Sequence, residues 1–150
     1  STSPPAAYGD LINDNFLSIG EAWIAYTPTW TGSTTNPVIG NGTLTGAYKQ
    51  LGKLLFFRIY CLAGGTTTFG SGDYRWALPT GITSAAVEQV IAASAVDAST
   101  NRYPGVGVIS ASTSIVLLQP NVGVNFVKHD NPVTWASGDY FVLGGCIEVA

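Results

Sequence analysis

Short strand-like segments separated by glycine-rich turns recur along the chain from Tyr26 to its end. Residues 43–50 and 53–63 are two runs rich in apolar residues that meet at Leu51-Gly52, which is typical of a β-hairpin. Further runs cover residues 75–79, 87–96, 105–110 and 114–118, and Gly, Asn, Ser and Pro fill the intervals. Strands spaced about 8–12 residues apart with such turns predict an all-β fold, a β-sandwich of the jelly-roll kind.

The run from Lys53 to Ala63 is apolar on both faces of the expected strand. Leu55, Phe57, Ile59 and Cys61 alternate with Leu54, Phe56, Arg58 and Tyr60. A strand of this kind is typical of a sheet covered on both sides, or of a contact between subunits.

The tetrapeptide Ser-Gly-Asp-Tyr occurs twice, at residues 71–74 and 137–140, each time directly before an aromatic-rich run. We interpret the two copies as equivalent corners of a sandwich and not as a repeat of whole domains.

One segment, residues 10–23, follows a helical period. Its apolar residues are Leu11, Ile12, Phe16, Leu17, Ile19 and Trp23, and Asp10 precedes them as an N-cap. An isolated helix of about three turns is marginal in water, so we expect these residues to be attachment or oligomer contacts. The predicted organisation is an N-terminal linker and attachment helix over 1–25 and a β-domain over 26–150. The opening Ser1-Thr2-Ser3-Pro4-Pro5 is typical of a linker, so we expect a chain processed or cut from a longer one.

Charged residues make up only 10% of the chain, against 46% hydrophobic residues. A surface this poor in charge favours self-association, because a soluble monomer of this size usually carries more charge. The six Lys and Arg residues are scattered and the net charge is −3, which argues against nucleic-acid binding. The densest apolar stretch, residues 54–63, is too short to span a bilayer.

Few residues are arranged as catalytic or metal-binding groups. His129 is the single histidine, no serine lies in a Gly-x-Ser-x-Gly elbow, and no P-loop is present. The nine acidic residues lack the spacing of a calcium loop, and Cys61 and Cys146 lack the spacing of zinc ligands. We therefore predict a protein that is not an enzyme and that has no metal and no cofactor, with two free thiols favoured over a disulfide.

Two connections, residues 97–104 and 119–135, are the least strand-like of the β-domain. Loops on a rigid β scaffold often carry recognition. Their charged and aromatic side chains form the predicted ligand-binding set: Arg102, Tyr103, Lys128, His129, Asp130 and Trp135. The simpler alternative, which we favour for the rings of Tyr103 and Trp135, is that they are packing residues. Trp23, Trp30 and Trp76 are expected in the core or at a subunit contact.

The motif Tyr26-Thr-Pro-Thr-Trp30 resembles a recurrent C-terminal domain of bacteriophage tail proteins. The likeness continues through Asn36-Pro37, Gly40-Asn41-Gly42, Gly46, Tyr48, Gly52, Thr66 to Gly72 and Leu78-Pro79. Residues 10–15 resemble the collar segment that precedes such domains, and residues 135–149 resemble the last strand of a trimeric jelly roll of the tumour-necrosis-factor-like kind. The resemblance is close over about residues 8 to 80, and over the remainder it rests on the general pattern and not on matching residues.

This resemblance implies a homotrimer exposed on a virion as a tail fibre, spike or receptor-binding domain. The implied partners are further copies of the chain, other virion proteins bound through the N-terminal segment, and a glycan or protein of the host cell surface. Two alternatives stay open: a capsid head-fibre or decoration protein bound through residues 1–25, and a non-catalytic carbohydrate-binding module that uses the 97–104 and 119–135 loops. A capsule-degrading hydrolase is a third and less favoured alternative.

Overall fold

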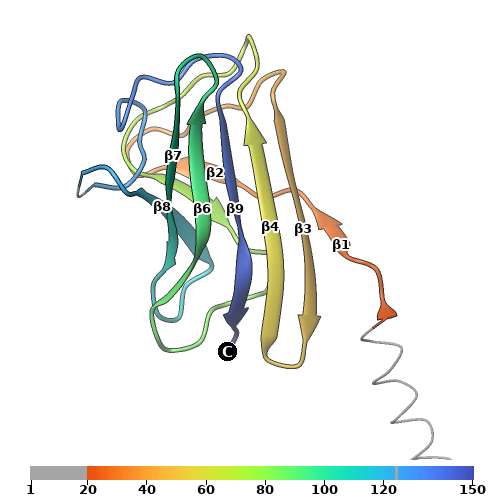
Figure 1. Cartoon of the computed structure of the whole chain (residues 1–150). Coiled ribbons are helices and arrows are strands. Elements are labelled where there is room, and N and C mark those ends of the chain that lie inside the picture. The colour runs from red at the N-terminus through yellow and green to blue at the C-terminus, as the bar shows by residue number, and fades with distance from the viewer. Residues whose placement is uncertain (1–19, 124) are drawn as a thin grey trace, which may run out of the picture.

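The protein folds as one curled sheet of nine antiparallel strands in a computed structural model that describes residues 20–123 and 125–150 (Figure 1). The strands are β1 (Ile24–Tyr26), β2 (Trp30–Gly32), β3 (Thr43–Leu51), β4 (Leu54–Leu62), β5 (Tyr74–Ala77), β6 (Gln89–Asp97), β7 (Asn101–Ile109), β8 (Ile115–Pro120) and β9 (Tyr140–Glu148). Their order across the sheet is β1-β3-β4-β9-β6-β7-β8-β5-β2. The all-β prediction is confirmed.

The predicted hairpin between residues 43–50 and 53–63 is present as β3 and β4. Leu51 pairs with Leu54, and Gly52 in the turn has a φ of 58°. A left-handed backbone of this kind favours glycine. The turn predicted at Leu51-Gly52 is confirmed.

Residues 97–104, expected to be a loop, instead form the tight end of a second hairpin and the start of β7. Asp97 pairs with Asn101, and the strand pairing of β6 and β7 runs through Pro104. The Asp97 carboxylate closes the turn, because Ser99 Oγ and Thr100 Oγ1 each donate a hydrogen bond of 2.7 Å to it. These hydroxyls also lower the pKa of Asp97. Because these turn residues are polar, the sequence pattern predicts a loop for the first residues of β7.

The core lies inside the curl, where β2 and β5 pack across β9. Figure 1 shows β2 passing behind β6 and β9. The ring centroids of Trp30 and Trp76 lie 6.0 and 5.3 Å from that of Phe141, and both indoles are buried. Trp30 and Trp76 are thus core residues, one of the two placements expected for them.

The two Ser-Gly-Asp-Tyr turns share a backbone form but not a position in the fold. Gly72 and Gly138 both have positive φ, at 81° and 94°. Tyr74 points into the core, whereas Tyr140 is half-buried on the outside of the sheet and the next residue, Phe141, is buried. The two corners are therefore not equivalent, because their strands enter the sheet with opposite faces inward.

Both cysteines are free thiols, as the sequence favoured. Cys61 is buried on the inner face of β4, and Cys146 is exposed on β9. Burial raises the pKa of the Cys61 thiol to about 12. Cys61 is therefore a packing residue and not a reactive one.

The predicted attachment helix falls mostly outside the described residues, as do Leu11, Ile12, Phe16, Leu17 and Ile19. Trp23 is described, and its exposed indole contacts the guanidinium of Arg58, whose Cζ lies 5.1 Å from the ring centroid. The pairing of β1 with β3 begins at Ile24. Within the described part of the chain, no helix is long and apolar enough to cross a membrane.

Candidate binding surface

The outside of the sheet across β4, β9, β6 and β7 carries several exposed apolar side chains. The strand register places Tyr60, Val142 and Ser94 in one row, and Arg58, Gly144, Ala92 and Val106 in the next. Tyr60 and Val142 are each 37% exposed, Val106 is 39% exposed and Val90 is 61% exposed. The outer face of an antiparallel sheet that meets water is usually polar, so this composition points to a binding surface.

Two shallow hollows lie side by side on this surface, and together we call them the outer groove. The first, of about 300 Å³, lies over β3 and β4 and includes Ala47 and Tyr60. The second, of about 320 Å³, lies over β9 and β6 and includes Ser94 and Arg102. Arg58 and Val142 line both hollows. Ala92 pairs with Gly144 at the floor of the second hollow. The hollow exists because neither residue has a large side chain.

The charged groups of the outer groove are two arginines, and neither pairs with a carboxylate. The ion-pair contacts recorded among the described residues, those of Asp130 with Lys128 and His129, involve neither arginine. Arg58 stacks on Trp23. Arg102 donates a hydrogen bond of 2.9 Å from Nη2 to the Tyr140 hydroxyl, and its Cζ lies 5.9 Å from that ring's centroid. The surface is thus locally positive in a chain of net charge −3.

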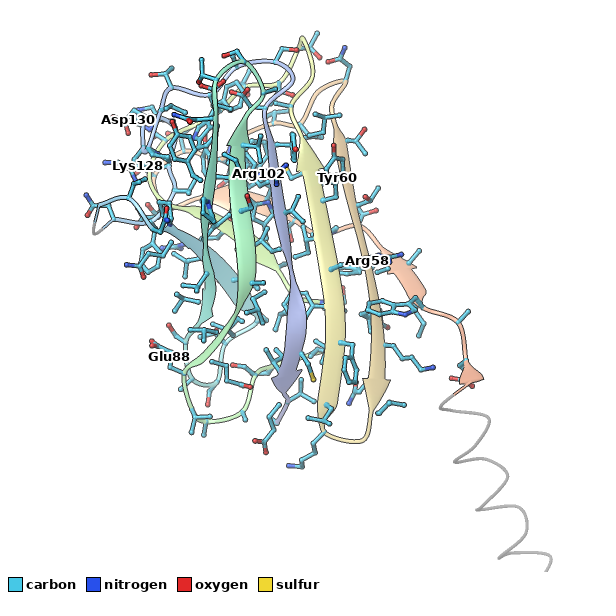
Figure 2. The ribbon with its side chains drawn as sticks, viewed as in Figure 1. Arg58, Tyr60, Glu88, Arg102, Lys128 and Asp130 are labelled. Carbon is cyan, nitrogen blue, oxygen red and sulfur yellow. The ribbon has the colours of Figure 1, made fainter. Side chains whose placement is uncertain are left out.

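Two tyrosine rings and a buried serine hydroxyl lie in or beside the outer groove. The Tyr140 ring lies 5.7 Å, centroid to centroid, from that of Tyr60. Figure 2 labels Arg102, Tyr60 and Arg58 across the strands that carry the groove. Ser94 Oγ is shielded from solvent and has no hydrogen-bond partner in the described part of the chain. A buried hydroxyl without a partner costs free energy.

The six residues predicted to bind a ligand fall into three places. Lys128, His129 and Asp130 lie together on the loop after β8, where Lys128 Nζ and His129 Nδ1 are each 3.7 Å from Asp130 Oδ1. Arg102 lies apart from them, in the outer groove. Tyr103 and Trp135 pack together with ring centroids 6.4 Å apart.

Trp135 belongs to the core, and the loop is built around it. Its indole is buried, lies 4.7 Å from the Phe141 ring centroid, and donates a 2.7 Å hydrogen bond to the Lys128 carbonyl. Asn131 Nδ2 donates a 2.8 Å hydrogen bond to the Phe126 carbonyl and further orders the loop. These contacts match the packing alternative for Tyr103 and Trp135.

Sequence reasoning did not single out Arg58, Tyr60, Ser94 or Tyr140 as binding residues. The signal that could have found two of them, Arg58 and Tyr60, was the strand of residues 53–63, whose second face is apolar yet holds one arginine and one tyrosine. Tyr140 and Ser94 join that face only through the pairing of β9 with β4 and β6.

Within residues 20–123 and 125–150, no group of three or more His, Cys, Asp or Glu side chains could hold a metal ion. None of the residues that line the two hollows is a carboxylate, a histidine or a cysteine. The outer groove therefore offers cationic, aromatic, hydroxyl and apolar contacts. No protein-family model, curated protein or solved structure matches the chain.

Proposed function

We propose that the chain is a homotrimeric structural and host-binding module of a virion, a tail fibre, spike or receptor-binding domain with a jelly-roll-type β-domain. The observation that carries the binding role is the outer groove, an apolar surface with two unpaired arginines on a rigid sheet. The virion placement rests on the resemblance of about residues 8 to 80 to phage tail domains.

Binding is favoured over catalysis by the side chains of the outer groove. General acid–base or nucleophilic chemistry needs a carboxylate, histidine, cysteine or activated hydroxyl with a base beside it. The lining residues instead supply hydrogen-bond donors and apolar contact, which recognise a ligand without transforming it. A rigid scaffold suits this role, because β4, β9 and β6 are each paired on both sides.

Assembly is assigned to the N-terminal segment, which leaves the outer groove free for a ligand. Trp23 joins that segment to the sheet through its contact with Arg58. In this arrangement residues 1–19 hold the three copies together and fasten them to the particle, and the β-domains project their grooves outward.

The first test is the mass in solution of the full chain and of a chain that lacks residues 1–19, by light scattering. The deletion leaves β1 intact, so circular dichroism of both proteins should show the same β content. We expect a trimer for the full chain and a monomer for the truncated one. A full chain that is monomeric at micromolar concentration would overturn the trimer. A truncated chain that remains trimeric would move the assembly contact into the β-domain.

A further inference from the structure

We infer that the outer groove binds an acidic sugar chain, whose carboxylates pair with Arg58 and Arg102 and whose ring faces lie in the two hollows. This inference rests on the proposed role as a host-binding module and specifies the class of ligand and the surface that holds it.

The charge of the outer groove calls for an anionic ligand. Arg58 and Arg102 both line the second hollow, and neither has a carboxylate within 4.0 Å in the described chain. The planar guanidinium matches a carboxylate with two parallel hydrogen bonds, and such charge-assisted pairs are stronger than neutral ones. Two arginines that face one hollow can therefore hold two acidic groups, or one acidic group and its neighbouring hydroxyls.

The sheet favours a sugar chain over a peptide. Peptides that bind sheets usually add as a strand to a free edge, where backbone groups are unpaired. The outer groove lies over β4, β9 and β6, in the middle of the sheet, where backbone groups already pair with strands on both sides. Only side chains are left to make hydrogen bonds, so the ligand itself must supply many polar groups, as a sugar does.

The remaining contacts suit the two kinds of surface that a sugar ring presents. The Tyr60 ring, which lines the first hollow and is 37% exposed, offers an apolar face with a hydroxyl at the edge, and the Tyr140 ring packs beside it with centroids 5.7 Å apart. Val142 and the low floor at Ala92 and Gly144 admit the C–H face of a ring. Ser94 lines the second hollow, but its Oγ is shielded from solvent and has no partner within the described residues, so the hydroxyl must rotate toward the hollow to meet a ring hydroxyl.

The two hollows provide room for consecutive units of a chain. They share Arg58 and Val142, so a ligand can pass from one hollow to the other without a gap. Arg58 then lies between two units, and Arg102 lies toward the end of the second hollow.

A second copy of the chain is a poorer occupant of the same groove. Two copies joined face to face would bring Arg58 and Arg102 of each together, with no acidic residue among the lining side chains to neutralise them. Like charges brought together and desolvated at an interface weaken association.

The test measures binding of the full chain to three carboxylated glycans, namely oligogalacturonate, hyaluronan and polysialic acid, by calorimetry at low salt. Neutral dextran and dextran sulfate serve as comparison polymers. We expect binding to at least one carboxylated glycan, weakened by added salt. Arg58→Gln and Arg102→Gln should each lower the affinity about tenfold, or about 1.4 kcal/mol, because each removes a charge-assisted hydrogen bond to the ligand.

A double variant, Lys53→Gln with Arg75→Gln, is the matched control for Arg58→Gln with Arg102→Gln. It removes the same two charges from positions outside both hollows, and it should keep the affinity of the unaltered chain. Circular dichroism and light scattering on all variants verify that fold and assembly are retained.

Four results would overturn the inference. The first two are no binding to any of the three glycans, and an equal loss of affinity in the control double variant. The other two are tighter binding of dextran sulfate than of every carboxylated glycan, and a change of oligomeric mass in the Arg58→Gln and Arg102→Gln variants. The last result would make the groove a contact between copies. A trimer that fails to bind glycans overturns only the ligand, whereas a monomer that binds them overturns only the proposed assembly.

Discussion

At the scale of single residues, Asp73 and Asp139 occupy the same place in identical tetrapeptides but make different contacts. Asp139 is buried, and its carboxylate accepts hydrogen bonds of 3.0 Å from the Ala98 N–H and 2.7 Å from the Ala136 N–H. Asp73 is half-buried, and its backbone N–H donates a hydrogen bond of 2.9 Å to Ser33 Oγ. The Asp139 carboxylate ties the β6–β7 turn to the chain before β9.

Replacing Asp139 should therefore destabilise the fold far more than the same change at Asp73. We expect Asp139→Ala to lower the free energy of unfolding by about 2 kcal/mol, because two backbone donors lose a charged acceptor. Asp73→Ala should cost less than about 0.5 kcal/mol, as is usual for a substitution that removes no buried contact. Urea unfolding followed by tryptophan fluorescence measures both values. Equal losses would show that the carboxylate at position 139 has no special role.

At the scale of elements, β4 joins the core to the outer groove through its two faces. Leu55, Phe57 and Ile59 are almost fully buried on the inner face. Phe56, Arg58 and Tyr60 project from the other face, where Phe56 is half-buried and the other two are exposed. Because side chains alternate along a strand, one segment supplies both stability and a binding surface.

Two adjacent phenylalanines on β4 provide a matched test of this division. Phe57→Ala should lower the free energy of unfolding by about 3–5 kcal/mol, since it removes a ring that is 1% exposed from a packed core. Phe56→Ala should cost about 1 kcal/mol or less, because the outer ring is only half-buried. Urea unfolding at low protein concentration gives both numbers. A loss at Phe56 as large as that at Phe57 would mean that another surface covers the outer face of the sheet.

At the scale of the whole molecule, one cysteine thiol and two tyrosine hydroxyls are buried in the core or next to it. Burial raises the pKa of the Cys61 thiol from 9.0 to about 12. It also raises the pKa of the Tyr26 and Tyr74 hydroxyls well above their ordinary value. The Tyr74 hydroxyl in addition donates a 2.8 Å hydrogen bond to the Phe69 carbonyl, which ionisation would abolish.

The stability of the fold should consequently fall in alkali. As pH rises past about 9, the unfolded chain releases these protons while the folded chain retains them, so unfolding becomes progressively more favourable. The stabilising effect is fully present below the ordinary pKa values and is lost as pH rises toward the raised ones. We expect the urea midpoint to stay level from about pH 7 to 8.5 and to fall steadily above about pH 9.5. A midpoint that stays level up to about pH 11 would contradict the burial of these groups.

The sequence alone determined the fold class, the β3–β4 hairpin and the two faces of β4. These features follow from local rules, namely the two-residue period of a strand and the preference of glycine for a left-handed turn at Gly52. The packing alternative for Tyr103 and Trp135 follows from the general preference of large aromatic rings for buried or partly buried positions.

Only the tertiary structure decided what lies on the outer face of the sheet. Arg58, Ser94, Arg102 and Tyr140 come from four strands, and the order β4-β9-β6-β7 brings them onto one surface. That order joins the last strand of the chain to strands from its middle, and no local pattern fixes such a pairing. The same pairing turns Tyr140 outward and Tyr74 inward from identical tetrapeptides, because the face that a residue presents depends on its register with neighbouring strands.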